Sequence, residues 1–378
     1  MLKVSKLKKI AVIFGTRPEA IKMAPVIKEL QKYPNIFKPL ICVTAQHREM
    51  LDEVLKLFAI APHYDLNIME DSQSIFQVTA KGLLGIKGIL EAEKPTMVLV
   101  QGDTTTAFAV SLASFYLKIP LGHIEAGLRT GDKYKPFPEE INWQLISVIT
   151  DLHFVSTQRA KLNLLREGIA KEKIFVTGNT VVDALFYVLK KIEDKKDYDW
   201  PFSFLESRSN RLILVTAHRR ESFGKPLKNI CCALKKIVKR DKSTIVVYPV
   251  HPNPNIQNTV RKILGNAERI HLISPLDYFH FVYLMNRSYL ILTDSGGIQE
   301  EAPSLGKPVL IMRDRTERPE GIEAGVAKLV GTEINNIVKN VENLLNDREV
   351  YERMARVANP FGDGKGAQRI VDILLSWR

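Results

Sequence analysis

The sequence predicts an α/β protein of two lobes, each built around a parallel sheet. Short apolar runs rich in Val and Ile alternate with helical patterns along the chain, which is typical of consecutive βαβ units. With 378 residues, 45% of them hydrophobic, the chain exceeds what one core usually organises and is apolar enough to fill two. A strand that runs through a glycine turn into a helix occurs in both halves, which favours two lobes that share one ligand.

The expected strands fall into two sets. In the first lobe they are residues 10–14, 40–44, 97–101, 121–124, 152–155 and 174–177. In the second lobe they are residues 212–216, 244–249, 270–273, 290–293, 308–312 and 327–330. Residues 177–180 lie between the two sets and are a candidate hinge, and a last helix is expected over 367–377.

The composition argues against several other classes of protein. The net charge of +12 comes from 54 Lys and Arg spread among 42 Asp and Glu, without an aromatic–basic RNA-binding signature, so most of it is expected on solvated surface. Cys42, Cys231 and Cys232 form neither a disulfide framework nor a CxxC pair. The chain shows neither a membrane-span pattern nor a secretory signal pattern. We therefore expect a cytoplasmic protein that binds no nucleic acid and no membrane.

The run from Ile291 to Glu301, which contains Ser295, Gly296 and Gly297, carries the strongest functional signal. Glycines allow a ligand close to the backbone, and the free N–H groups and dipole of a helix start favour an anion. Glu301 falls about one turn inside the helix, where it can accept hydrogen bonds from sugar hydroxyls. In the alternative, Ser295 only caps the helix and the glycines only form a turn. We favour a diphosphate site because a similar element occurs near the N-terminus.

That second element follows the apolar run 10–14. Thr16 and Glu19 have the spacing of a capping box, which predicts a helix start directly after the strand. Arg17 lies at the tip of the strand and Lys22 about one turn further on, so both cations are placed to reach the crevice where open α/β sheets bind ligands. Solvated surface charges are the alternative for both.

Carboxylates follow two neighbouring strands of the first lobe. Asp103 comes after the run 97–101, and Glu125 comes after the run 121–124. Because consecutive parallel strands usually lie close together, we expect these two acids to share one crevice. Capping of the helix from residue 104 is the alternative for Asp103, whereas Glu125 precedes no obvious helix.

Acids at a helix start and histidines behind strands complete the candidates. Glu139 and Glu140 open a helix, where the dipole favours acids in any case. His218 and His251 each follow a predicted strand of the second lobe, a better position for function than a helix face. None of the eight histidines has a metal-ligand spacing such as HExxH, and the chain has no GxGxxG motif for a dinucleotide.

With these motifs the chain resembles the non-hydrolysing UDP-N-acetylglucosamine 2-epimerases over nearly its full length. The resemblance is carried by Phe-Gly-Thr-Arg-Pro-Glu-Ala from Phe14, Val-Thr-Ala-Gln-His-Arg-Glu-Met from Val43, Gly-Asp-Thr-Thr-Thr from Gly102, Glu-Ala-Gly-Leu-Arg-Thr from Glu125, Ala-His-Arg-Arg-Glu-Ser from Ala217 and Thr-Asp-Ser-Gly-Gly-Ile-Gln-Glu-Glu from Thr293. It implies the glycosyltransferase-B architecture, two Rossmann-like domains with parallel sheets and an active site in the cleft between them. The implied domains are residues 1–178, with the helix 367–378 crossing back onto them, and a UDP-binding domain, residues 179–366.

The resemblance implies reversible C2 epimerisation of UDP-N-acetylglucosamine (UDP-GlcNAc) to UDP-N-acetylmannosamine (UDP-ManNAc), without a cofactor such as NAD and without a metal, for the synthesis of surface polysaccharide or glycans. A base removes the C2 proton as the C1–O bond to UDP breaks, and UDP adds back to the resulting 2-acetamidoglucal. The implied catalytic residues are Asp103, Glu125, Glu139 and His218. The implied contacts with the UDP-sugar are Arg17, Lys22, Phe281 beside the uracil, Ser295, Gly296 and Gly297 at the diphosphate, Glu301 at the ribose, and Arg318.

The resemblance also implies a homodimer and a second, activating UDP-GlcNAc. The activator's contacts would fall on Gln46, His47, Gln73, Arg219 and His251. The chain departs from some activated members at Glu49, where they have Gln, and at Ser72, where they have Arg, and it has Trp143 where the family usually has Arg. The alternative functions are a hydrolysing epimerase that releases UDP and ManNAc, a glycosyltransferase of the same architecture, and a nucleotide-sugar sensor, which would not need the acids of the first lobe.

Overall fold

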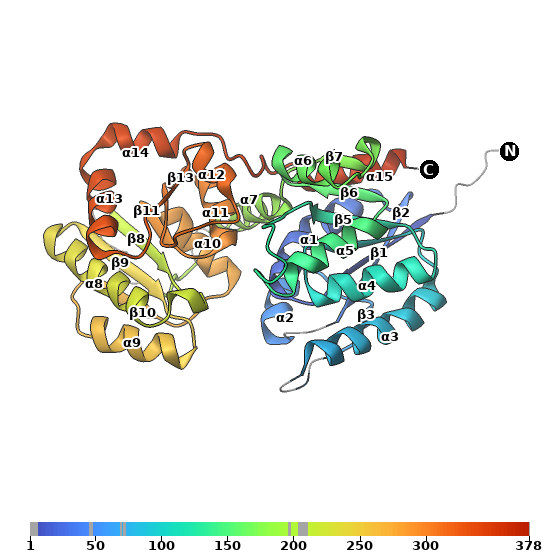
Figure 1. Ribbon diagram of the computed structural model, residues 1–378, viewed down its shortest axis with the longest axis horizontal. Helices are drawn as coiled ribbons and strands as arrows, with labels where there is room; N and C mark the ends of the chain where they lie inside the picture. Colours follow the sequence, from blue (N-terminus) through green and yellow to red (C-terminus); the bar gives the residue numbers. More distant parts are fainter. Residues whose placement is uncertain are drawn as a thin grey trace. The chain divides into compact units, whose positions relative to one another are not determined.

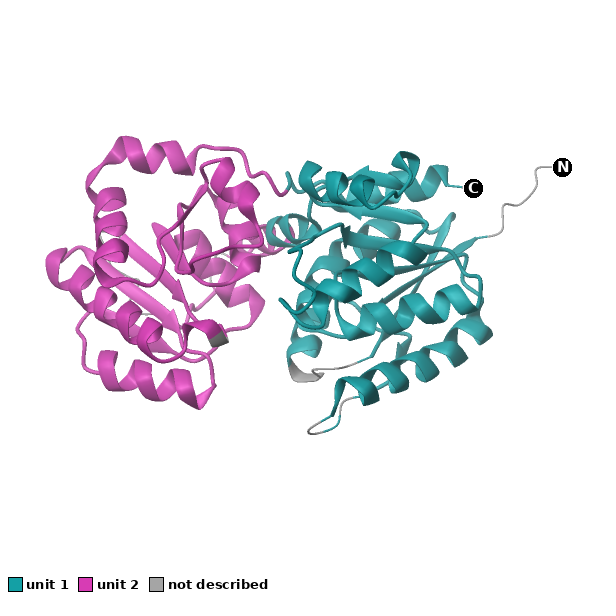
Figure 2. Cartoon of the chain, viewed as in Figure 1, with its two compact units in different colours: residues 1–186, 362–378 teal, residues 187–361 magenta. Residues whose placement is uncertain are grey.

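The computed structural model describes residues 7–44, 48–68, 70, 73–195, 198–202 and 211–377. The chain forms two compact units (Figure 2). Unit 1 comprises residues 1–186 and 362–378, and unit 2 comprises residues 187–361. Each unit contains one parallel sheet, and helices pack against it (Figure 1). The predicted α/β class with two parallel sheets is therefore confirmed.

The sheet of unit 1 has seven strands in the order β3-β2-β1-β4-β5-β6-β7. The strands are β1 (Lys8–Phe14), β2 (Phe37–Val43), β3 (Tyr64–Asp65), β4 (Met97–Gln101), β5 (Leu121–Ala126), β6 (Leu152–Val155) and β7 (Ile174–Val176). The helices are α1 (Arg17–Leu30), α2 (Arg48–Leu57), α3 (Ile75–Glu93), α4 (Thr105–Tyr116), α5 (Glu139–Ile149), α6 (Gln158–Arg166), α15 (Gly366–Ser376) and α7 (Thr180–Glu193), which continues into unit 2. Buried side chains of β1, β2 and β4 pack with those of α3 and α4 to form a core on one face of the sheet.

The sheet of unit 2 has six strands in the order β10-β9-β8-β11-β12-β13. The strands are β8 (Arg211–Thr216), β9 (Thr244–Pro249), β10 (Ile270–Ile273), β11 (Leu290–Thr293), β12 (Val309–Ile311) and β13 (Ala327–Leu329). The helices are α8 (Lys225–Arg240), α9 (Pro254–Leu264), α10 (Tyr278–Arg287), α11 (Gly296–Glu301), α12 (Pro319–Glu323), α13 (Ile334–Asn346) and α14 (Arg348–Ala355). A core of described residues in this unit joins β8, β9 and β11 to α8, α9 and α13.

Every apolar run of the sequence is a strand in one of the two sheets. Strand β3 was not predicted. It contains only Tyr64 and Asp65, which pair with Cys42 and Val43 at the edge of the sheet. Two residues are too few to show an alternating or a buried pattern, so the hydrophobic signal could not reveal this strand.

The turn between β1 and α1 is fixed by Gly15 and Glu19. A Cβ atom on Gly15 would lie 2.7 Å from Oγ1 of Thr106, so a larger residue does not fit. The capping box predicted for Thr16 and Glu19 is present, and Oε2 of Glu19 accepts hydrogen bonds from the backbone N–H groups of Thr16 and Gly15 at 2.8 and 3.1 Å. Its Oε1 accepts a hydrogen bond from Oγ1 of Thr104 at 2.7 Å, which joins this turn to the start of α4.

The last helix, α15, belongs to unit 1 although it follows unit 2 in the chain. The carboxylate of Asp183, in α7, accepts hydrogen bonds from the backbone N–H groups of Gly366 and Ala367 at 3.1 and 2.9 Å, which caps the start of α15. At its other end, Nζ of Lys8 donates to the carbonyl of Leu374 at 3.2 Å. These contacts tie α15 to both the first strand and the first residues of α7.

Two histidines lie next to each other inside the sheet of unit 1. His123 of β5 and His153 of β6 are register partners, and both side chains are 0% exposed. Nε2 of His123 lies 2.7 Å from the carbonyl oxygen of Gly102. Burial lowers the pKa of His123 to about 4 and that of His153 to about 3. Both imidazoles are therefore neutral near pH 7.

This pair predicts acid sensitivity of the fold. In the unfolded chain both histidines bind protons below about pH 6.5, whereas the folded chain takes them up only near the lowered pKa values, so stability is lost as pH falls. The loss is up to about 1.4 kcal/mol per pH unit for each histidine. Urea unfolding at about pH 7.5 and pH 5 measures this change in the free energy of unfolding for the wild type and for a His153→Gln variant. The variant should lose less stability than the wild type.

Replacement of the exposed His251 by Gln is the matched control, because it removes a histidine from the surface and leaves the buried pair in place. If His153→Gln kept the full pH dependence, the buried pair would not be its source.

Candidate active site

Glu125 is the centre of the polar contacts in unit 1. It lies at a register shift between Ile124 and Ala126 of β5, and its φ is +61°. A residue with a side chain rarely adopts this left-handed conformation, which costs of the order of 1–3 kcal/mol. Such strain persists only where the surroundings hold the residue in place. The side chain is only 5% exposed, so its surroundings are protein groups.

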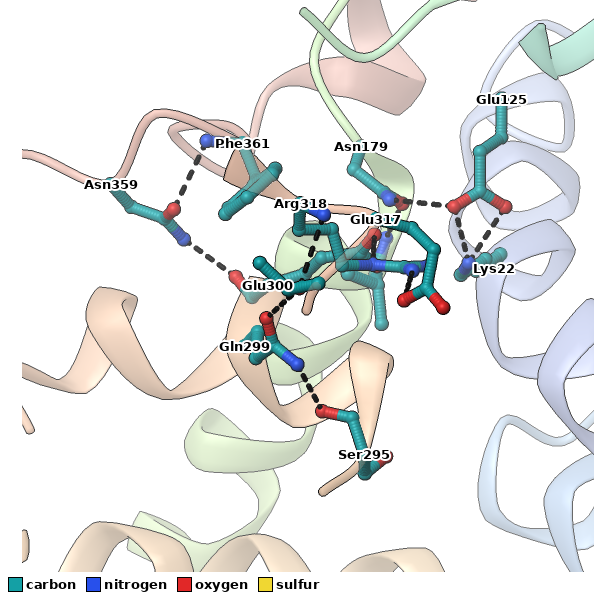
Figure 3. A network of polar contacts seen from close by, with 12 residues as sticks. Lys22, Glu125, Asn179, Ser295, Gln299, Glu300, Glu317, Arg318, Asn359 and Phe361 are labelled. Atoms are coloured by element: carbon teal, nitrogen blue, oxygen red, sulfur yellow. Dashed lines mark hydrogen bonds and ion pairs between the residues drawn. The ribbon is translucent and has the colours of Figure 1, made fainter. Parts of the chain in front are cut away.

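Three side chains hold the Glu125 carboxylate. Nζ of Lys22 lies 2.6 and 2.7 Å from its two oxygens, and Nδ2 of Asn179 donates to Oε1 at 3.1 Å (Figure 3). Nε2 of Gln101 donates to Oε2. The Lys22 side chain is 12% exposed, so the solvated-charge alternative is wrong for this residue. A nearly dry ion pair of this kind is costly to break, because removal of one partner leaves the other charge buried.

Asp103 follows β4 and is half-buried. The cap of α4 is Thr104, whose side chain accepts from the backbone N–H of Ala107 at 3.0 Å, so the capping alternative for Asp103 is wrong. Burial, together with the negative charges of Glu125 and Glu139, raises the pKa of Asp103 to about 7. The expected proximity of Asp103 and Glu125 is thus confirmed. A carboxyl group with this pKa can both give and take a proton near neutral pH.

The two acids at the start of α5 differ in their contacts. Glu140 is fully buried, and its carboxylate accepts hydrogen bonds from N and Oγ1 of Thr130 at 2.8 and 2.9 Å. It therefore holds the loop that precedes the helix. Oε2 of Glu139 is also buried, but it has no hydrogen-bond partner among the described residues. One turn along α5, Nε1 of the buried Trp143 likewise lacks a partner in the described ranges.

In unit 2, His218 and Arg219 follow β8, as the sequence predicts. The His218 side chain is 41% exposed, and its ring stacks on that of His251 with centroids 5.7 Å apart and an interplanar angle of 14°. Nη1 of Arg219 lies 3.7 Å from Oε1 of Glu317. The ends of β8 and β9 thus bring His218 and His251 together.

The turn after β11 is shaped by Gly296 and Arg318. Ser295 occupies the N-cap position of α11, but within the described structure its side chain makes no capping hydrogen bond, so the cap alternative is wrong. A Cβ atom on Gly296 would lie 2.7 Å from Nη1 of Arg318, so glycine lets the guanidinium group approach the helix start. Nε of Arg318 donates to Oε1 of Glu300 at 2.7 Å (Figure 3).

Glu301 lies at the C-terminal end of α11 and is 7% exposed. Its Oε2 accepts a hydrogen bond from the hydroxyl of Tyr278 at 2.6 Å. Tyr278 begins α10, the helix that also carries Phe281. Glu301, the predicted ribose contact, and Phe281, the predicted uracil contact, are therefore linked through Tyr278 and α10.

Arg313 and Glu317, which form a cluster with the predicted Arg318, were missed in the sequence. Nη1 and Nη2 of Arg313 donate to the two oxygens of Glu317 at 2.8 and 2.9 Å, and Nη1 of Arg318 lies 3.8 Å from the same carboxylate. Burial would raise the pKa of Glu317, but the contacts with Arg313 lower it to about 2. The sequence does contain a signal for this cluster. Residues 313–318 alternate in charge directly after β12, and the carboxyl end of a parallel strand is a common place for a binding site.

Gln101 and Asn179 were also missed. Both lie at the carboxyl ends of strands, Gln101 as the last residue of β4 and Asn179 just after β7. The rule that identified Asp103 and Glu125 would have found them, had amides been considered as well as acids.

The remaining candidates lie on separate elements. Arg17 is the first residue of α1, and Nε2 of Gln73 donates to the carbonyl of Ile68 at 2.7 Å. Gln46 and His47 lie outside the described residues. The described part of the chain contains no group of three or more His, Cys, Asp or Glu side chains arranged to hold a metal ion. Of its helices, none is long and apolar enough to cross a membrane.

Comparison with known proteins identifies close relatives. The family model of UDP-N-acetylglucosamine 2-epimerase matches residues 28–375. The enzymes of that name from Salmonella typhimurium and Escherichia coli K12 are 53% and 52% identical over 374 and 372 residues, which cover 98% and 97% of this chain and 99% and 98% of theirs. The structure of UDP-GlcNAc 2-epimerase from Neisseria meningitidis bound to UDP-GlcNAc has a TM-score of 0.92 and 51% identity, covering 98% of this chain and all of that one. The Methanocaldococcus jannaschii enzyme in complex with UDP-GlcNAc and UDP has a TM-score of 0.83 and 38% identity, covering 98% and 100%.

The raised pKa of Asp103 predicts a pH dependence opposite to that of the histidine pair. The folded chain keeps this proton up to about pH 7, whereas the unfolded chain loses it near pH 3.8, so Asp103 destabilises the fold as pH rises between these values. An Asp103→Asn variant cannot ionise. The free energy of urea unfolding of this variant, minus that of the wild type, should therefore be larger at about pH 8 than at about pH 5, which means that the variant is relatively more stable at the higher pH.

Asp314→Asn is the control, because it removes an exposed carboxyl group and leaves Asp103 in place. Parallel pH curves for the wild type and Asp103→Asn would contradict the raised pKa.

Proposed function

The chain belongs to the UDP-N-acetylglucosamine 2-epimerase family, and we propose that it is a non-hydrolysing member that interconverts UDP-GlcNAc and UDP-ManNAc. The observation that carries the proposal is the pair formed by Glu125, which is held in a strained backbone conformation, and Asp103. The pKa of Asp103, about 7, suits a group that gives and takes protons near neutral pH. The relatives' names and the UDP-GlcNAc bound in the Neisseria meningitidis structure support the same substrate.

The chemistry of the substrate favours elimination. No carbonyl group activates the C2–H bond of the sugar, so direct deprotonation to a carbanion would be very slow. When the C1–O bond to UDP breaks as the C2 proton leaves, the product is neutral 2-acetamidoglucal and the negative charge passes to UDP. Re-addition of UDP, with protonation from the other face, gives the epimer. In this scheme Asp103, Glu125 and Glu139 supply the acid and base groups.

Unit 2 supplies the nucleotide contacts in this proposal. Ser295, Gly296 and Gly297 bind the diphosphate together with Arg318, and Glu301 binds the ribose beside Phe281 at the uracil. His218 acts as a catalytic group from this unit, and Arg17 and Lys22 of unit 1 contact the nucleotide sugar. The approach of the Arg318 guanidinium group to Gly296 supports the diphosphate role, since donors aimed at a developing phosphate charge stabilise it.

Elimination predicts solvent exchange at C2. In D2O, proton NMR of UDP-GlcNAc with the chain should show loss of the C2 proton signal and formation of UDP-ManNAc that carries deuterium at C2. Positional isotope exchange of the oxygen that bridges C1 and the β-phosphorus tests the C1–O cleavage independently. Product that retained its original C2 proton would contradict elimination, and accumulation of free ManNAc with UDP would identify a hydrolysing enzyme instead.

A pair of variants separates chemistry from binding. Glu125→Gln keeps the size of the side chain but removes its charge and replaces one acceptor oxygen by a donor, so kcat should fall by about 10²-fold or more while nucleotide affinity, which this proposal assigns to unit 2, survives. Glu301→Ala should mainly weaken UDP binding. Steady-state kinetics and UDP titration calorimetry measure both effects, and the exposed Glu172→Gln serves as the control that changes neither. The reverse pattern would show that these roles are wrongly assigned.

We also propose that UDP-GlcNAc activates the chain at a second site formed by Gln46, His47, Gln73, Arg219 and His251, and that the chain is a homodimer. UDP-ManNAc alone should then turn over slowly and be stimulated by added UDP-GlcNAc. Because Ser72 cannot supply the cation that Arg would, stimulation should need about tenfold more UDP-GlcNAc than in relatives with that Arg. Full turnover of UDP-ManNAc from the first seconds, unaffected by UDP-GlcNAc, would exclude the activator.

A further inference from the structure

Asp294 is a buried carboxylate directly behind His218. It follows β11, and its side chain is 0% exposed. Its Oδ2 accepts hydrogen bonds from the backbone N–H groups of His218 and Arg219 at 2.8 and 2.9 Å, and from Oγ of Ser222 at 3.2 Å. Three donors from the segment after β8 therefore fix the orientation of this carboxylate.

The other oxygen of Asp294 has a different environment. Oδ1 is buried and has no hydrogen-bond partner among the described residues. It lies 3.5 Å from Nδ1 of His218. This distance exceeds that of a good N–H···O hydrogen bond, which is about 2.7–3.2 Å, but a small rotation of the half-exposed imidazole closes it. An unpaired buried carboxylate oxygen is costly, so a donor at Nδ1 is strongly favoured.

We propose that Asp294 is a positioning residue that holds neutral His218 in the tautomer with the proton on Nδ1. Nε2 is then the unprotonated nitrogen, which can accept a proton from a bound molecule. The same carboxylate stabilises the imidazolium once the proton has arrived, because opposite charges attract strongly where water is excluded. This inference rests on the proposed function only in giving His218 a catalytic role.

The geometry makes Asp294→Asn an informative variant. The position of Oδ2 is surrounded by donors, so the single amide oxygen of Asn must occupy it. The amide NH2 group then takes the place of Oδ1 and faces Nδ1 of His218 as a donor. Nδ1 must become an acceptor, so the proton of the neutral ring moves to Nε2. The substitution thus reverses the tautomer while the size of the side chain is unchanged.

The tautomer is measured directly by NMR of the full chain labelled with ¹⁵N-histidine, at about pH 9, where an ordinary imidazole is neutral. The His218 signals are assigned by their absence in His218→Gln. We expect the Nδ1–H tautomer in the wild type and in Ser222→Ala, which keeps the carboxylate, and the Nε2–H tautomer in Asp294→Asn. An Nε2–H tautomer in the wild type, a measurement that needs no variant, would overturn the proposal. So would an unchanged tautomer in Asp294→Asn.

Steady-state kinetics provide a second test of the role of Asp294. In Asp294→Asn, kcat for epimerisation should fall by about 10²-fold or more, whereas the dissociation constant for UDP should stay within about threefold of the wild type. Unchanged kcat together with a reversed tautomer would overturn the positioning role of Asp294. If the wild type failed to epimerise UDP-GlcNAc, the proposed function would fail, and the NMR result would still decide whether Asp294 sets the tautomer.

Discussion

The contact on which unit 1 most depends is the one between Lys22 and Glu125. Glu125 keeps a left-handed backbone conformation at the register shift of β5 because its carboxylate is held by Lys22 from α1, by Gln101 from β4 and by Asn179 from the turn before α7. Lys22 lies in α1, which begins at Arg17 shortly after the end of β1, and Gly15 in the turn between them leaves room for the side chains of Thr44 and Thr106. One carboxylate therefore fixes the relative positions of two strands and two helix starts.

The two units place different ionisable groups at the carboxyl ends of their strands. Unit 1 gathers carboxyl groups, which raise the pKa of one another, as at Asp103. Unit 2 gathers guanidinium groups at the ends of its strands, where Arg313 and Arg318 meet Glu317. An elimination needs both environments, since a proton leaves carbon where a base is available and negative charge builds up on a diphosphate where cations are available.

The sequence predicts every strand of the described residues except β3, together with the acids and histidines that follow these strands, because hydrophobic runs and chain order alone determine them. It does not predict the partners of those residues. Lys22 and Asn179 are 103 and 54 residues away from Glu125, and their contacts arise from the order of strands in the sheet. For the same reason the pairing of His123 with His153 and the contact of Asp294 with His218 appear only in three dimensions. The short strand β3 was missed because it is too small to carry a pattern.

The position of α15 has a consequence for synthesis. Unit 1 is completed by α15, which is synthesised only after all of unit 2. Until then, Asp183 and Lys8 cannot make their hydrogen bonds with the backbone of this helix. Domains usually fold in the order in which they emerge. Here the nascent first unit remains unfinished, with the surface of α1 that α15 will cover still open to solvent, while the second unit can already form its own core. Translation therefore exposes unit 1, rather than unit 2, to the longest period in which chaperones or proteases can act on it.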